Sequence, residues 1–342
     1  MRDKHIFTII MDTYNRPFWL KEAVDAILRQ TYENLEIILI NNGATAETIE
    51  YLHEIDSRDA RVKLVHFEDN QWRPEDPLRV VDVCFNAGLA EANGDYIFYQ
   101  SDDDWMDDEY AEKMVKLFID DSECITAAGL PVPVDANSNI INKGPRKTNL
   151  RSRYMSGYEM SLNTLRGGNM FSAPGSIFTI RTDVLRSMGG FHRNLEKSHL
   201  YGIVPFGTTG FDETARFYWR RHDSQLNVLL AESGKVWLND LDVWLNEWEI
   251  QKRWQIFGSD VAQELVTTLQ EIQLRSTAIW FVSNFFHGRL RTCKSMLEQI
   301  LCTDYMLRFL IKLPTGLWYR RHDLLFLFRI LKKKLYRIFL LD

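Results

Sequence analysis

The chain is poor in cysteine. Four of its 342 residues are cysteines, Cys84, Cys124, Cys293 and Cys302, and no two of them lie close together in the sequence. Structural zinc sites use closely spaced cysteine ligands, and disulfide frameworks use many cysteines. The spacing therefore argues against both and predicts a protein of a reducing compartment, which we expect to be the cytoplasm.

Long apolar runs are also lacking. The longest candidate, residues 276–288, is shorter than the roughly 18 apolar residues that span a bilayer, and Arg289 and Arg291 follow it. Residues 1–5 lack the apolar stretch and small-residue cleavage site of a signal peptide. We expect neither a spanning helix nor export by that route.

An excess of positive charge is absent, since the net charge is −6. This balance argues against nucleic acid as a partner. Residues 275–342 differ from the rest, with 13 Lys and Arg against 4 Asp and Glu. The sequence shows no internal repeat, and 45% hydrophobic content with 13% aromatic residues is ample for a buried core.

What is present is an alternation of strand and helix patterns. Strands are expected at residues 6–11, 35–40, 62–66 and 95–100, and helices at 16–28, 45–55 and 80–92. This order predicts an α/β fold whose sheet is mostly parallel and flanked by helices, as in Rossmann-like proteins. We expect residues 1–120 to form a nucleotide-binding half.

Residues 121–260 are expected to complete this domain as its acceptor half. Strands are predicted at 125–134 and 174–180, and a helix is predicted from Phe211 to about Arg221. Residues 261–342 are expected to form a basic, amphipathic helical appendage.

The most informative motif is the acidic run Ser101–Trp105, which follows the strand at 95–100. Neighbouring carboxylates at the end of a buried strand repel one another, so such a cluster commonly holds a divalent cation that bridges to phosphates. The alternative is a solvated loop that caps the next helix. Thr13, Tyr14, Asn15, Asn41 and Asn42 would meet this cluster at the carboxyl edge of the sheet.

Several stretches, in this order, resemble the family 2 inverting glycosyltransferases of the GT-A fold. The matching segments are Ile9–Arg16, Ile27–Tyr32, Leu35–Gly43, Asn86–Ile97, Ser101–Trp105 and Gly189–Phe191. The resemblance covers about residues 5–225 and implies transfer of a sugar from a nucleotide-diphosphate donor.

The resemblance also implies a donor site. Tyr14 matches the residue whose ring stacks on the base, with Thr13 and Asn15 beside it; the alternative is that Tyr14 is a packed strand-end aromatic. Asn42 stands where the family usually has an aspartate, so a uridine donor is expected but less secure. We expect Arg79 to contact a phosphate.

The resemblance places an Asp-x-Asp-like metal motif at the acidic run, where Ser101 replaces a frequent aspartate. Asp103 is expected to ligate Mg²⁺ or Mn²⁺, and Asp102 to contact the ribose or the metal. Asp104 is expected to be a second ligand or a local cap. The cation would offset charge that develops on the leaving diphosphate.

Inverting transfer also needs a base for the acceptor hydroxyl. The resemblance points to the segment that follows Gly189–Phe191, and the candidates are Asp212 first and Glu213 second. The alternative is that Asp212 caps the predicted helix and Glu213 complements its dipole.

The appendage interleaves aromatic and aliphatic residues with Lys and Arg, most clearly at 324–339. This pattern fits helices that lie on an anionic membrane surface, and it suits a lipid-linked acceptor. Packing on the catalytic domain and a homodimer interface remain open alternatives.

We therefore expect a metal-dependent glycosyltransferase, peripheral on the inner face of the cell membrane. It would use a UDP-sugar and a glycan or lipid-linked oligosaccharide acceptor in surface polysaccharide assembly. One alternative is a non-catalytic scaffold or glycan-binding subunit of the same fold, because frequently acidic positions are occupied by Asn41, Asn42, Ser101 and Thr214. The other is a nucleotidyltransferase, which residues 13–16 do not favour because they form no Gly-rich triphosphate loop.

Overall fold

A computed structural model of the chain describes residues 5–73, 76, 78–141, 153–160, 178–192, 202–223, 225, 252, 254–301 and 305–319. It divides the chain into two compact units, Met1–His222 and Asp223–Asp342. The boundary that we expected near residue 260 falls inside the second unit. Each unit is described by itself.

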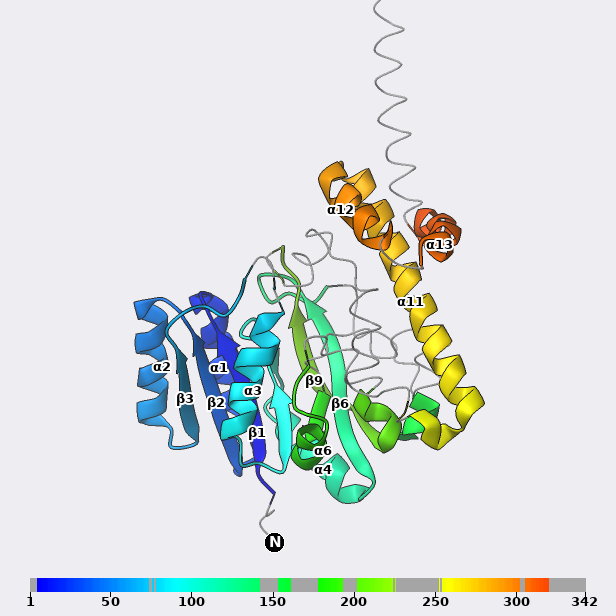
Figure 1. Cartoon of the computed structure of the whole chain (residues 1–342). Helices are drawn as coiled ribbons and strands as arrows, with labels where there is room; N and C mark the ends of the chain where they lie inside the picture. The colour runs from blue at the N-terminus through cyan, green and yellow to red at the C-terminus, as the bar shows by residue number, and fades with distance from the viewer. Residues whose placement is uncertain are drawn as a thin grey trace, which may run out of the picture. The chain divides into compact units, whose positions relative to one another are not determined.

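The first unit begins with four parallel strands, as the sequence predicts. They are β1 (Phe7–Thr13), β2 (Leu35–Asn42), β3 (Val62–Phe67) and β4 (Tyr96–Tyr99). Their order in the sheet is β3-β2-β1-β4 (Figure 1). Every residue of β2 and β4 is buried, which explains why these strands appear in the sequence as continuous runs rather than alternating patterns.

Helices cover both faces of these strands. They are α1 (Pro17–Leu28), α2 (Ala46–Arg58), the π-helical turn η1 (Val81–Phe85), α3 (Asn86–Glu91) and α4 (Tyr110–Asp120). On one face α3 packs closely against β1 and β2, since a Cβ added at Gly88 would lie 2.5 Å from Ile10 Cγ2 and 3.1 Å from Ile40 Cδ1. On the other face the rings of Phe98 and Tyr110 lie 5.1 Å apart, which joins β4 to α4.

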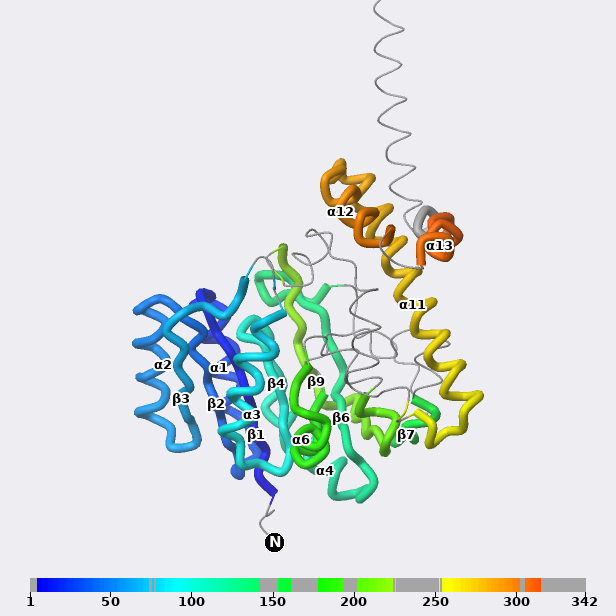
Figure 2. Tube along the Cα trace, viewed as in Figure 1, coloured from blue at the N-terminus to red at the C-terminus, as the bar shows by residue number. Residues whose placement is uncertain are grey.

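The sheet continues beyond β4 through five further strands, of which β6 and β9 are the longest. These are β5 (Trp105–Met106), β6 (Cys124–Val134), β7 (Tyr154–Ser156), β8 (Phe178–Arg181) and β9 (Thr208–Arg220), with α6 (Thr182–Ser187) and η4 (Val204–Phe206) between them. The order is β4-β8-β6-β9-β5, and β7 pairs with β9. Figure 2 traces β6 and β9 side by side.

The strand directions decide where the site forms. Strand β8 is antiparallel to both β4 and β6, and β9 is parallel to β6. The carboxyl ends of β4, β6 and β9 therefore lie at the same edge as those of β1 and β2. This edge brings residues near 13, 42, 102, 134 and 220 toward one another.

The helix predicted up to about Arg221 is wrong, because strand β9 runs through this segment as far as Arg220. Exposed Thr214 and Arg216 alternate with buried Ala215 and Phe217, which is the period of a strand. Aromatic residues at the end of the segment favour a strand as well. The capping role considered for Asp212 is removed with the helix.

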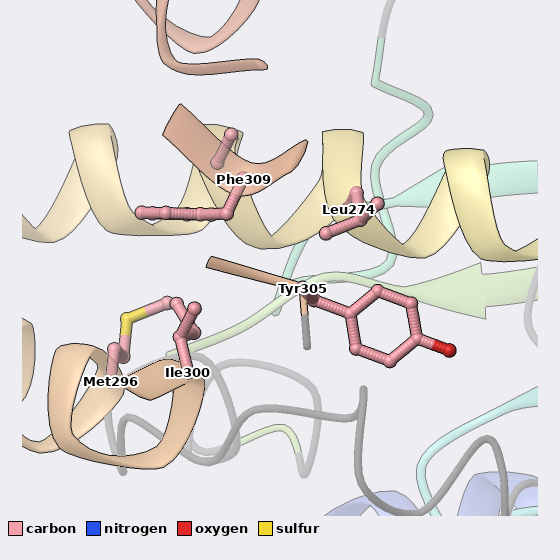
Figure 3. Packing of buried hydrophobic residues seen from close by; sticks show 6 residues of the cluster. Leu274, Met296, Ile300, Tyr305 and Phe309 are labelled. Atoms are coloured by element: carbon pink, nitrogen blue, oxygen red, sulfur yellow. The ribbon is translucent and has the colours of Figure 1, made fainter. Parts of the chain in front are cut away.

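The second unit is helical in its described part. It contains η5 (Trp254–Phe257), α11 (Ser259–Phe286), α12 (Leu290–Leu301) and α13 (Met306–Tyr319). A buried cluster joins the three α-helices (Figure 3), and its members are Leu274, Ala278, Met296, Ile300, Tyr305 and Phe309. The expected helical character is confirmed here, whereas the basic segment 324–339 lies outside the described residues.

Candidate active site

Three carboxylates of the acidic run are buried at the carboxyl edge of the sheet. Asp102, Asp103 and Asp104 are 5%, 6% and 2% exposed, and they lie in the short loop between β4 and β5. The solvated loop considered from the sequence is therefore wrong. Burying three neighbouring acids is unfavourable unless other groups compensate their charge.

The chain after β1 supplies the first compensation. Thr13 Oγ1 donates a hydrogen bond to Asp102 Oδ2 at 2.8 Å. Arg16 Nη1 lies 2.9 Å from Asp102 Oδ1 and 2.6 Å from Asp103 Oδ2, so one guanidinium nitrogen bridges two carboxylates. The predicted meeting of the 13–16 segment with the acidic run is confirmed as geometry.

His222 supplies a contact that the sequence did not predict. Its Nε2 atom lies 2.9 Å from Asp103 Oδ2, and its ring centroid lies 4.4 Å from that of Trp19. From the sequence alone, a lone histidine is more often structural than functional. Its place just after the end of β9 shows only once the direction of that strand is known.

Arg220, the last residue of β9, anchors the acidic loop at residues 101–104. This residue is fully buried, its backbone N–H donates to Asp104 Oδ1 at 2.8 Å, and its Nε donates to Asp103 O at 2.8 Å. The guanidinium carbon lies 5.3 Å from the Trp19 ring centroid and 4.7 Å from that of Trp105. Such an arrangement combines cation–π contacts with hydrogen bonds and fixes the position of the loop.

Glu22 of α1 completes this support. Its carboxylate forms an ion pair with Arg220 Nη2 and accepts a hydrogen bond from Ser138 Oγ. Arg220 Nη1 also donates to Ala136 O at 3.1 Å. The end of β9 is thereby tied to α1 and to the loop after β6.

The charges of these carboxyl groups are only partly compensated. Burial, reinforced by the neighbouring charge of Asp103, raises the pKa of Asp102 to about 7 despite the opposing effect of Arg16. Burial and Asp103 also raise the pKa of Asp104 well above its usual range. Asp12, whose pKa burial raises, faces the same region and accepts a hydrogen bond from Tyr99. A cation would relieve this repulsion.

The donor chemistry suits a divalent ion. Carboxylate oxygens of Asp102 and Asp103 and the imidazole nitrogen of His222 are ligands that Mn²⁺ and Mg²⁺ accept to different degrees. In the described part of the chain, however, no three His, Cys, Asp or Glu side chains are already arranged around one ion. Arg16 lies between the two carboxylates, so a metal ion and this guanidinium would compete for the same oxygens.

The predicted base-binding residues lie at the ends of β1 and β2. Tyr14 is 42% exposed and follows Thr13, which pairs with Asn41 in the sheet. Asn42 is 2% exposed, and its Oδ1 accepts a hydrogen bond from Gln71 N at 2.7 Å. The packed-aromatic alternative for Tyr14 is disfavoured, because the ring keeps substantial exposure.

Arg79 is connected to this end of the sheet through the same glutamine. Its Nη2 lies 3.4 Å from Gln71 Oε1, and Gln71 N contacts Asn42. Gln71 thus connects Asn42 with Arg79. Whether Arg79 contacts a phosphate stays a prediction.

The neighbouring asparagines shape the turn after β2. Asn15 Oδ1 accepts from Thr45 N at 2.9 Å, and Asn41 Oδ1 accepts from Ala44 N at 2.8 Å. Gly43 has a φ of +66°, and a Cβ there would lie 2.3 Å from Asn70 N, so glycine is required. Asn15, Asn41 and Gly43 thus fix the turn after β2.

Asp212 and Glu213 are not brought to the acidic loop. Asp212 pairs with Gly129 at a bulge of β9, and its Oδ1 accepts hydrogen bonds from the backbone and hydroxyl of Thr214. From Arg216 to Arg220 alone the strand advances on the order of 13 Å. The base role of Asp212 and Glu213 stays a prediction that this placement does not favour.

Comparison with protein families gives a match to "Glycosyl transferase family 2" over residues 8–189. An uncharacterized glycosyltransferase of Haemophilus influenzae is 33% identical over 114 residues, which cover 33% of this chain and 42% of the relative. Glycosyltransferase GlyA of Streptococcus pneumoniae is 28% identical over 113 residues, which cover 33% of this chain and 15% of the relative. The matched segments therefore span less than half of these curated relatives.

Solved structures show the same fold. S. aureus TarS 1-349 in complex with UDP-GlcNAc aligns with a TM-score of 0.52 at 11% identity, covering 85% of this chain and 89% of that one. The mannosyltransferase PcManGT from Pyrobaculum calidifontis, in complex with GDP-Man and Mn²⁺, aligns with a TM-score of 0.51 at 12% identity, covering 91% and 83%. The fold is therefore GT-A, and the chain belongs to glycosyl transferase family 2.

Proposed function

We propose that the chain transfers a sugar, with inversion, from a nucleoside-diphosphate donor to a hydroxyl group of an acceptor. The observation that carries this proposal is the meeting of Asp102 and Asp103 with Arg16 and His222 at the carboxyl edge of the sheet. Excess negative charge there calls for a cation, and a diphosphate supplies oxygens that such a cation also binds. The exposed ring of Tyr14 at the same edge offers a surface for a base.

Each group of this site has a role in the proposal. Tyr14 stacks on the base, and Thr13 orients Asp102 through the hydrogen bond to its Oδ2. Asp103 and Asp102 face the diphosphate, and Asp104 is a local cap because it accepts from Arg220 N. Arg16 moves from the carboxylates to the diphosphate oxygens when the donor enters, since both are anionic partners for a guanidinium.

We propose Mg²⁺ or Mn²⁺ as the cofactor, held by Asp103 with Asp102 or His222. When bound, such an ion supplies Lewis-acid stabilisation of the charge on the departing diphosphate. A neighbouring structure of the same fold contains Mn²⁺ with its donor, which supports the choice of a divalent ion. The choice between the two metals rests on the histidine, because an imidazole ligand suits Mn²⁺ better than Mg²⁺.

The acceptor is proposed to be a glycan or a lipid-linked oligosaccharide used in surface polysaccharide assembly. Support comes from the second unit, where Leu307, Leu310 and Ile311 of α13 are 71%, 46% and 64% exposed. Spacings of three and four residues place them on one side of the helix. Such a stripe, followed in sequence by the basic segment 324–339, fits peripheral contact with the inner face of a membrane.

Membrane contact has its own test. None of the described helices is long and apolar enough to span a bilayer. We expect the full chain to sediment with vesicles that contain anionic lipid, and the double variant Leu307→Ser/Ile311→Ser to sediment less. Equal sedimentation of both proteins would contradict membrane contact through this stripe. A concentration-dependent dimer that forms in the wild type and is lost in the double variant would favour the homodimer interface instead.

Calorimetric titration of nucleoside diphosphates, with and without Mn²⁺, tests the proposed activity. Binding should require the metal and should weaken at least tenfold, about 1.4 kcal/mol, in Asp103→Asn. Asp108→Asn is the matched control, because Asp108 is an exposed acid of the same segment that pairs with Arg29. Release of free nucleotide from nucleotide sugars then measures turnover.

The alternative is a non-catalytic scaffold or glycan-binding subunit of the same fold. Asn41, Asn42 and Ser101 at frequently acidic positions motivate it. Nucleotide binding that ignores both the metal and Asp103→Asn, or no binding at all, would favour this alternative.

A further inference from the structure

We infer that Trp19 is a positioning residue of the site, whose indole holds the imidazole of His222 against Asp103. The inference rests on the proposed function, in which His222 is a candidate ligand of the divalent ion. It adds the residue that orients this ligand. Trp19 acts through His222 and not on the donor itself.

The indole of Trp19 is fixed at its polar edge. Trp19 lies in the first turn of α1 and is partly buried. Its Nε1 donates a hydrogen bond to Ala136 O at 3.2 Å, in the turn that follows β6. The same carbonyl oxygen accepts from Arg220 Nη1 at 3.1 Å, and the guanidinium carbon lies 5.3 Å from the indole centroid. The indole therefore has a set orientation before any ligand binds.

The helix that carries Trp19 is tied to the same elements. Glu22 lies three residues further along α1, so the two side chains share one side of the helix. The carboxylate of Glu22 forms an ion pair with Arg220 and accepts from Ser138 Oγ at 3.0 Å. The first turns of α1, the end of β9 and the turn after β6 thus form one connected support.

The imidazole of His222 rests on this support. Its centroid lies 4.4 Å from that of the Trp19 ring with 34° between the planes, and its Nε2 lies 2.9 Å from Asp103 Oδ2. A rotation about the Cβ–Cγ bond that turned Nε2 away from Asp103 would also turn the ring off the indole face. The stacking contact therefore fixes the plane of the imidazole and, with it, the direction of Nε2.

Arg16 offers a contrast, because it reaches the same carboxylate oxygen without such a support. Arg16 Nη1 lies 2.6 Å from Asp103 Oδ2, and the Arg16 side chain is 31% exposed, whereas that of His222 is 6% exposed. A long, partly exposed side chain can leave for another anionic partner, but a buried ring stacked on an indole cannot leave without unpacking. Trp19 thus makes His222 the stationary partner of Asp103.

The orientation of an imidazole ligand affects its affinity for a metal ion. Contacts that orient a histidine ligand typically contribute about 10- to 100-fold to metal affinity. An imidazole also suits Mn²⁺ better than Mg²⁺. Loss of the Trp19 ring should therefore weaken Mn²⁺ binding more than Mg²⁺ binding. A general loosening of the site would instead weaken both ions alike.

Metal titration of the full chain tests the inference, with electron paramagnetic resonance of free Mn²⁺ as the measurement and Mg²⁺ as the competitor. Trp19→Leu should bind Mn²⁺ about tenfold more weakly and Mg²⁺ less than about threefold more weakly. Trp19→Phe keeps an aromatic face but not the donor to Ala136 O, and it should retain most of the Mn²⁺ preference. In the His222→Gln background, Trp19→Leu should leave the ratio of the two affinities unchanged.

Trp105→Leu is the matched control. Trp105 is the other partly buried tryptophan against Arg220, at 4.7 Å from the guanidinium carbon, and it stacks on Tyr218 rather than on an imidazole. Its loss should therefore keep the wild-type ratio of Mn²⁺ to Mg²⁺ affinity, even where the protein melts at a lower temperature.

The outcomes separate the inference from the proposed function. Equal losses for the two ions in Trp19→Leu, or a further fall of the ratio when Trp19→Leu is added to His222→Gln, would overturn the inference. An unchanged ratio in His222→Gln would overturn it as well and would leave Asp102 and Asp103 as the ligands of the proposed function. Failure of the wild type to bind either ion would overturn both.

Discussion

Arg16 Nη1 lies 2.6 Å from Asp103 Oδ2, a carboxylate oxygen of the proposed metal ligand. The same nitrogen lies 2.9 Å from Asp102 Oδ1. In the absence of metal the guanidinium therefore compensates two buried acids. This gives Arg16 two opposing effects, since it stabilises the metal-free protein and competes with the cation.

Replacement of this arginine separates the two effects. Arg16→Met should bind Mn²⁺ about tenfold more tightly in the absence of nucleotide, because a competing cation is removed. The melting temperature of the metal-free variant should fall, since two carboxylates lose their partner. Electron paramagnetic resonance of free Mn²⁺ measures the first effect and thermal denaturation the second. Weaker Mn²⁺ binding by Arg16→Met would show that the arginine organises the site instead.

The raised pKa of Asp102 predicts how metal binding depends on pH. Its pKa of about 7 means that the carboxyl carries a proton in acid solution, and a metal ion must displace that proton. Mn²⁺ affinity should therefore rise about tenfold per pH unit up to pH 7 and level off above it. Asp102→Asn should abolish this dependence, whereas Asp108→Asn should retain it.

The stability of the metal-free protein should fall as the pH rises, whereas the Mn²⁺ affinity rises. A carboxyl whose folded pKa is raised above the usual 3.8 stabilises the folded state while protonated, and that contribution is lost as the pH rises from about 4 through 7. The wild type should thus melt at lower temperature at pH 8 than at pH 6, and the difference should be smaller in Asp102→Asn. An equal difference in both proteins would assign the effect to another group.

Arg220 should matter more to stability than any exposed arginine of the first unit. Removal of its charge leaves Glu22 without its ion-pair partner and removes the donor to Asp103 O. Arg220→Met should lower the free energy of unfolding by about 3 to 5 kcal/mol, measured by urea denaturation. Arg221→Met is the matched control, since Arg221 is exposed and stacks on Trp219. Similar losses in the two variants would contradict this role.

The sequence predicted the first four strands and the meeting of residues 13–16 with the acidic run. Strands β1, β2 and β4 are short and largely buried, so continuous apolar runs mark them, and the order of a parallel sheet brings the strand ends together. The three acids could be recognised because they follow β4 directly. The local hydrophobic pattern was sufficient to predict those contacts that follow from the order of the strands in the sheet.

The contacts that strand β9 makes with the acidic loop could not be predicted from the sequence. Arg220 and His222 reach Asp103 across 117 and 119 residues, and they do so only because β9 is a strand parallel to β6. The helix that we expected there placed Asp212 in the site and left His222 outside it. Aromatic residues at 217–219 fit either element, and pairing with β6 decides between them.

Glu36 offers a prediction far from the site, at the start of β2. Its carboxylate accepts hydrogen bonds from Lys63 Nζ at 2.6 Å, Asn93 N at 2.7 Å and Thr8 Oγ1 at 2.7 Å. Burial alone would raise the pKa of Glu36, but these hydrogen bonds outweigh it and lower the pKa to about 2. The contribution of Glu36 to stability is therefore present above the usual pKa of 4.5 and lost as the pH falls toward 2.

Glu36→Gln should lower the free energy of unfolding at pH 7 by about 2 kcal/mol, because the amide can no longer accept at both ends and Lys63 loses its carboxylate partner. At pH 3 the difference between variant and wild type should shrink, because the unfolded wild-type chain takes up a proton below pH 4.5, whereas Glu36 stays ionised in the folded protein until the pH nears 2. Urea denaturation at the two pH values measures this. Nucleotide and Mn²⁺ binding should be unaffected, because Glu36 lies at the opposite end of β2 from Asn42. An equal loss of unfolding free energy at both pH values would show that the charge of Glu36 is not what stabilises the sheet.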